Sequence, residues 1–159
     1  MISHILVNIL CSFVGTIAFA VLFNVPRRFY LCCGLTGTAG WMLYVLCRDG
    51  FGITTAMASF FGALGVVLIS RLLTVRMKCP ITIFLISGII PLVPGAGIYF
   101  TAYYLVTDEL SMAAQRGMEA LKIAFAIVLG IVLIVSIPRE FFQIRYWKRR
   151  KALRKRGSA

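Results

Sequence analysis

Acidic residues are scarce in this 159-residue chain, which holds only five of them against seventeen lysines and arginines. It also holds a single histidine, and its five cysteines form no Cys-x-x-Cys pair. Enzyme active sites and metal centres are mostly built from clustered acids, histidines and cysteines. The sequence therefore predicts no metal site, no cofactor and no enzyme, and it disfavours in particular a membrane enzyme that acts on lipid.

Apolar residues are abundant instead. They make up 60% of the chain, and the mean hydropathy is +0.93. Apolar runs of about 20 residues, the length that crosses a bilayer, recur along the chain. The sequence thus predicts an all-α integral membrane protein. Five transmembrane helices are expected, at 3–23, 29–47, 51–73, 81–106 and 118–137, in a membrane domain over 1–138 followed by a basic tail over 139–159.

The first apolar run is expected to be a retained helix. It carries no Lys or Arg at its amino end, and its apolar region is long for a signal peptide.

The basic residues alternate with the predicted spans. Fourteen fall in or near the segments that follow spans one, three and five, and three in or near those that follow spans two and four. Cytoplasmic segments are enriched in Lys and Arg. We therefore expect the amino terminus outside and the carboxyl terminus inside, in the plasma (inner) membrane. The nine basic residues from Arg139 to Arg156 directly follow a span, which favours contact with anionic lipid over nucleic-acid binding.

The fourth predicted span contains its own break, "PLVPGAGIY" at 91–99. Proline removes a backbone donor and glycine weakens a helix, and freed backbone groups cannot face lipid. The break predicts either a plain kink or a midplane substrate site, where the N–H groups of a restarted half-helix bind a carboxylate. The residues expected to shape that site are Pro91, Pro94, Gly95 and Gly97, with Tyr99 and Thr101 as possible polar contacts.

A second glycine-rich stretch, "GLTGTAG" at 34–40, lies in span two. Residues three apart share a helix face, and small residues let membrane helices approach closely. The stretch indicates either close helix packing or a smooth face beside a substrate pathway. Its members are Gly34, Thr36, Gly37, Thr38 and Gly40.

The segment "NVPRR" follows span one. It is expected to stop the helix and fix its orientation. The alternative is that it holds a partner or a carboxylate with paired arginines. The residues concerned are Asn24, Pro26, Arg27 and Arg28.

Charged residues are nearly absent inside the spans. Arg71, Glu119 and Lys122 lie near span ends, and Glu119 and Lys122 are expected to pair. Proton-coupled carriers often place ionisable groups deep in the membrane. The chain is therefore expected to lack a complete coupling device, either because it couples no ion or because a partner supplies the acid.

Three stretches in order, "FNVPRR", "GLTGTAGWMLY" and "PLVPGAGIY", resemble the threonine/serine exporter (ThrE) family. The chain is most similar to the short YjjB-like form, which corresponds to the carboxyl-terminal membrane half of a full-length exporter. The resemblance implies export of small polar carboxylates, either threonine and serine or a dicarboxylate such as succinate. It also implies a second membrane subunit. The alternatives are a non-transporting subunit that stabilises a membrane partner, and a homo-oligomer.

Overall fold

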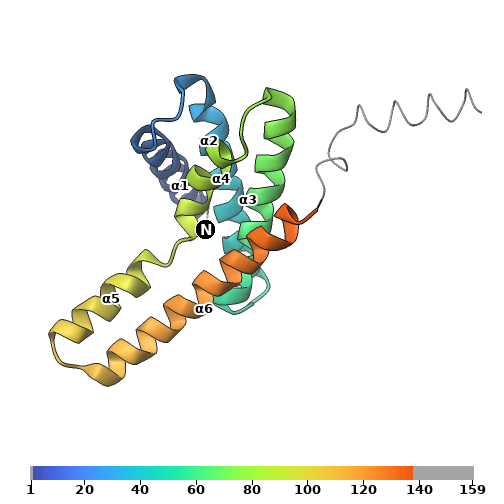
Figure 1. Ribbon diagram of the computed structural model, residues 1–159. Helices are drawn as coiled ribbons and strands as arrows, with labels where there is room; N and C mark the ends of the chain where they lie inside the picture. Colours follow the sequence, from blue (N-terminus) through green and yellow to red (C-terminus); the bar gives the residue numbers. More distant parts are fainter. Residues whose placement is uncertain (1, 138–159) are drawn as a thin grey trace, which may run out of the picture.

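The computed structural model describes residues 2–137, and within that range every regular element is a helix (Figure 1). The predicted all-α class is confirmed. The basic tail falls outside the described residues. The long helices are α1 (Ile2–Leu22), α2 (Tyr30–Val45), α3 (Thr55–Met77), α4 (Thr82–Ile89), α5 (Gly95–Val106) and α6 (Leu110–Val135). Short turns are η1 (Arg27–Phe29), the π-helical η2 (Leu46–Gly50) and η3 (Ile90–Leu92).

Within residues 2–137, four helical stretches are long and apolar enough to cross a membrane, and the count is five if the bent pair 82–92 and 95–106 forms one span. The chain bends by 54° between the two helical parts of that pair. The predicted Pro/Gly break is therefore confirmed. At 1.5 Å per residue, the 12 residues of α5 extend only about 18 Å and cannot cross a hydrocarbon core of about 30 Å alone.

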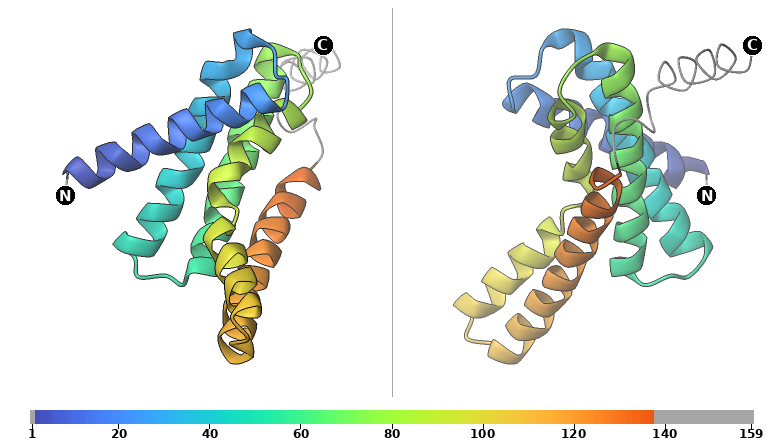
Figure 2. Two further views of the ribbon diagram at one scale, coloured as in Figure 1. Left: turned by 90° about the vertical axis from the view of Figure 1, so that its left-hand side faces the viewer. Right: turned by 45° about the vertical axis from the view of Figure 1, so that its right-hand side comes forward.

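Helices α1 to α4 form a bundle, and α5 with the first half of α6 forms a hairpin that projects from it (Figures 1 and 2). The second half of α6 returns to pack along α3. Two apolar clusters hold the bundle. The first contains Tyr44, Cys47, Ala58, Ala63, Val66, Leu92 and Ile127. The second contains Ala20, Val25, Phe29, Cys33 and Phe84.

The last helix begins at Leu110, not at Met118 as the hydropathy predicted. Residues 110–117 are mostly good helix formers, but their polar members interrupt the apolar run. Arg116 consequently lies on the helix. Glu119 pairs with Arg116, 3.4 Å away, so the expected pairing with Lys122 is wrong.

Arg71 is buried within α3, and it binds the end of α6. Its guanidinium donates one hydrogen bond to the carbonyl of Val135, 2.7 Å away, and another to the carbonyl of Ile137. The last carbonyls of a helix have no partner within it. Arg71 therefore caps α6 from the neighbouring helix.

Replacing Arg71 by methionine is expected to destabilise the protein. Hydrogen bonds to charged groups contribute about 1.5–3 kcal/mol, and the carbonyls would lose both donors. Thermal unfolding in detergent measures the effect. Arg76→Met, on the exposed part of the same helix, is the control and should leave the midpoint unchanged. Equal midpoints for the two variants would refute the capping role.

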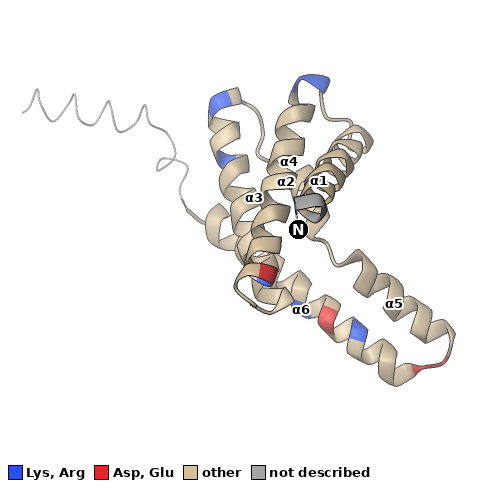
Figure 3. Cartoon of the chain, turned by 180° about the vertical axis from the view of Figure 1, so that it is seen from behind, with Lys and Arg blue, Asp and Glu red and all other residues tan. Residues whose placement is uncertain are grey.

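Basic residues of the α1–α2 and α3–α4 connections lie at one end of the bundle (Figure 3). Arg48, next to Asp49, lies on the α2–α3 connection, and two further basic residues lie on α6. The orientation in the membrane stays a prediction. Cys79 lies between α3 and α4, and burial raises the pKa of its thiol. The accessibility of this thiol therefore tests whether the α3–α4 connection is cytoplasmic, as expected.

In a chain whose only cysteine is Cys79, a membrane-impermeant maleimide is expected to react only after the membrane is opened. At neutral pH the rate should be lower than that of an unburied thiol, because the thiolate is the reactive form and burial raises the pKa of the Cys79 thiol. A chain carrying only Gly50→Cys, on the opposite connection, should react without opening. Labelling of Cys79 in intact cells would contradict the predicted orientation and place the α3–α4 connection outside.

Candidate functional site

The break between α4 and α5 has a defined backbone path. Helix α4 tightens into η3, which contains Pro91, and Val93 then adopts an extended conformation. The amide of Gly95 donates to the carbonyl of Val93 at 2.8 Å, and the amide of Ile98 donates to that of Pro94 at 3.0 Å. No side chain caps the start of α5. The break is therefore an ordered turn that ends one helix and starts another.

Gly95 is the most open point of the break. It is exposed, and a Cβ added to it would meet nothing within 4 Å. The first residues of a helix have N–H groups without a helical partner, and this end of the helix dipole is positive. Pro94 and Gly95 thus present the positive end of α5 at an uncrowded position.

Other residues predicted for this site lie elsewhere on α5. Gly97 faces α6, where an added Cβ would lie 3.2 Å from the Cβ of Ala120, and Thr101 packs against Gly117. The Thr101 hydroxyl donates to the carbonyl of Gly97 at 2.7 Å. Gly97 and Thr101 therefore lie at the seam between α5 and α6.

Tyr99 lies outside that seam and is 64% exposed. Pro91 is half-buried in η3, within the bundle. The structure therefore brings only Pro94 and Gly95 together at the open turn. A role in substrate binding stays a prediction for all six residues.

The glycine face of α2 is in contact with its neighbours. An added Cβ would lie 2.2 Å from the Thr16 hydroxyl at Gly37, and 2.2 Å from a methyl of Val66 at Gly40. At Gly34 it would meet the Phe13 ring at 2.6 Å. The face is thus filled by α1 and α3, which is the close packing that small residues allow. A pathway along it stays a prediction.

Threonines of the same stretch also sit in helix contacts. Thr36 is fully buried, packs next to Gly88 of α4, and donates its hydroxyl to the carbonyl of Cys32 at 2.7 Å. Within residues 2–137, the hydroxyls of Thr38 and Thr74 are buried without a hydrogen-bond partner. The other buried hydroxyls bond to carbonyls of their own helices, and belong to Ser12, Thr16, Ser59, Ser70 and Ser87.

The "NVPRR" segment ends α1. Asn24 adopts a left-handed conformation with φ 57°. Its amide donates to the carbonyl of Val21 at 3.0 Å, and the amide of Val25 donates to that of Ala20 at 3.0 Å. This pair of bonds is a Schellman cap, in which asparagine is tolerated at the left-handed position. Pro26, which cannot continue a helix, follows.

The two arginines form the start of η1. Arg28 lies over the ring of Phe29, 4.5 Å from its centroid, and Phe29 meets Phe84 of α4 edge to face at 5.6 Å. Arg27 and Arg28 are both exposed. The segment therefore stops α1 and anchors the next turn to α4, and partner binding through the arginines stays a prediction.

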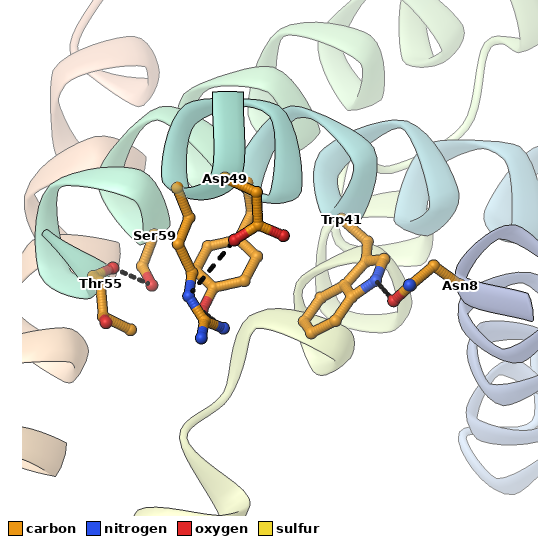
Figure 4. Close-up of polar contacts among 7 residues, drawn as sticks. Asn8, Trp41, Asp49, Thr55 and Ser59 are labelled. Carbon is orange, nitrogen blue, oxygen red and sulfur yellow. Dashed lines mark hydrogen bonds and ion pairs between the residues drawn. The ribbon is translucent and has the colours of Figure 1, made fainter. Parts of the chain in front are cut away.

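A polar cluster at the far end of α2 was missed from the sequence (Figure 4). The Trp41 indole N–H donates to the Asn8 side-chain oxygen at 2.9 Å, and the Trp41 and Tyr44 rings lie 5.0 Å apart. Arg48 donates to the Tyr44 hydroxyl at 3.4 Å and pairs with Asp49 at 3.7 Å. The spacing of Trp41, Tyr44 and Arg48 along one helix face was the available signal.

Comparison with known proteins identifies the family. The family described as "Threonine/Serine exporter, ThrE" matches residues 8–137. The chain belongs to the threonine/serine exporter family. It is 30% identical over 138 residues to the "Threonine/serine exporter" of Corynebacterium glutamicum, and 29% identical over 110 residues to the "Probable threonine/serine exporter" of Mycobacterium tuberculosis.

The matched regions differ in how much of each exporter they cover. They amount to 87% of this chain and 28% of the Corynebacterium protein, and to 68% of this chain and 20% of the Mycobacterium protein. The chain thus spans between a fifth and three tenths of the exporters it matches. No solved structure matches it. Family membership and the apolar helices together make it a multi-pass membrane protein of an exporter family.

Proposed function

We propose that this chain is the pathway-forming subunit of a plasma-membrane exporter of small polar carboxylates, with threonine and serine as the first candidates and a dicarboxylate such as succinate as another. The observation that carries the proposal is the ordered break at Pro94 and Gly95 in a member of an exporter family. An open helix start with a positive dipole end suits a carboxylate.

A second membrane subunit is part of the proposal. None of the residues of α5 is buried, although most of the helix is apolar and it contains no charged residue. A helix that is hydrophobic all round is covered in its functional state by protein or lipid. The matched regions cover only 20% and 28% of the two exporters, so most of each exporter has no counterpart in the residues compared.

Efflux tests the proposal directly. Cells loaded with labelled threonine, serine or succinate are compared when they express this chain, its candidate partner, or both. Efflux that requires both chains would support a two-component exporter and name its substrate class. Efflux from this chain alone would remove the second subunit from the proposal and favour a homo-oligomer. No efflux of any of the three from both chains, both present in the membrane, would refute it.

A non-transporting role remains the second candidate, because ionisable groups are scarce in the described spans. In that case the chain stabilises its partner, and deleting it lowers partner abundance but not transport per partner molecule. Quantifying the partner by immunoblot alongside efflux separates the two functions.

A further inference from the structure

One cation and one anion lie side by side at the end of α2. Arg48 and Asp49 are 3.7 Å apart, with 55% and 66% of their side chains exposed. Both belong to the π-helical turn η2. The π-helical hydrogen-bond pattern is rare in proteins, and here it ends the second helix. The pair is therefore accessible to a ligand and sits on an uncommon local backbone.

The arginine of this pair is held in place by the bundle. Its guanidinium donates to the Tyr44 hydroxyl at 3.4 Å, and Tyr44 is buried. Tyr44 lies against Trp41, whose indole N–H is bound by Asn8 of α1. A series of contacts thus runs from α1 to Arg48, which reduces the entropy that a long side chain loses when it binds a ligand.

The same cluster adjoins the break. Tyr44 and Cys47 share an apolar cluster with Leu92 of η3, and Trp41 and Ile89 pack against it. Two residues after Leu92 the chain reaches Pro94, where the open turn begins. The helix that leads into the charged pair therefore packs, through Tyr44 and Cys47, against the segment that leads into the break.

We propose that Arg48 and Asp49 form a recognition site separate from the open turn at Pro94 and Gly95, which the substrate occupies before or after that turn, with Arg48 binding the carboxylate of an α-amino acid and Asp49 its ammonium group. Arginine matches a carboxylate with two parallel hydrogen bonds. Asp49 would repel the second carboxylate of a dicarboxylate such as succinate, so the pair selects amino acids. This inference rests on the proposed export function.

Competition measures each half of the site. The wild-type protein, with its second subunit if export requires one, is reconstituted in vesicles that exchange labelled L-threonine. Unlabelled threonine should compete well. L-threoninol, which lacks the carboxylate, 3-hydroxybutyrate, which lacks the ammonium group, and succinate should each compete poorly.

Arg48→Gln is expected to raise the KM for threonine by about tenfold or more, since a hydrogen bond to a charged group is lost, and to abolish discrimination against threoninol. Asp49→Asn should instead abolish discrimination against 3-hydroxybutyrate. Arg48→Lys keeps the charge without the planar fork and should give an intermediate KM. Arg116→Gln removes half of a similarly exposed pair, Arg116–Glu119, on α6 and is the matched control.

The outcomes separate this inference from the proposed function. If the wild-type protein moves none of the labelled substrates, export itself fails. If it moves threonine and Arg48→Gln keeps both its KM and its discrimination against threoninol, the charge-recognition site is overturned. It is equally overturned if Arg116→Gln produces the same loss.

Discussion

Replacing Gly95 by leucine is expected to abolish export while the protein remains folded in the membrane. Nothing in the described chain lies within 4 Å of a Cβ at this position, so the new side chain meets no neighbour at its base. It would fill the open turn at the start of α5 and keep a substrate away from the backbone N–H groups. Efflux of labelled threonine, normalised to the amount of protein in the membrane, measures the effect.

Gly15→Leu provides the matched control for this change. Gly15 also has nothing within 4 Å of an added Cβ, but it lies on α1 and not in the turn between α4 and α5. This variant should export normally. Normal export by a well-expressed Gly95→Leu protein would show that the turn is only a kink.

Replacing Gly40 by alanine is expected to lower the stability of the protein, whereas Gly95→Leu is expected to lower export without unfolding it. The added Cβ would lie 2.2 Å from a methyl of Val66, which is fully buried and β-branched and therefore has little room to turn. Overpacking a core costs about 1–3 kcal/mol, which is expected to exceed the helix propensity of about 1 kcal/mol that alanine gains over glycine. The thermal midpoint in detergent should fall.

Gly15→Ala separates packing from propensity. This variant gains the same helix propensity at a position where an added Cβ meets nothing within 4 Å. Its thermal midpoint should therefore be unchanged or higher. If Gly40→Ala were as stable as Gly15→Ala, the close crossing of α2 and α3 would not be a source of stability.

The helix class and the break were predictable because both follow from local chemistry. Long apolar runs span bilayers, and Pro94 with Gly95 interrupts a helix in any surroundings. The start of α6 was not predicted correctly, because Ser111, Gln115 and Arg116 interrupt the apolar run although they do not interrupt the helix. Apolarity and helicity are different properties, and the hydropathy pattern reports only the first.

The candidate site was predictable only in part. The sequence pointed to the Pro/Gly turn, but it did not separate Gly95, which is open, from Gly97, which packs on α6. It also gave no reason to connect Asn8 with Trp41, which are 33 positions apart. Such distinctions depend on which neighbour lies opposite each residue.

The sequence by itself determined that this is a helical membrane protein with an interrupted fourth span, because transfer of apolar residues from water and the loss of backbone donors at proline act on each segment separately. The tertiary structure decided that Arg71 caps a helix far along the chain, that neighbouring helices fill the glycine face of α2, and that Asn8 of α1 binds Trp41 of α2. These depend on contacts between distant segments, which only the packed bundle creates.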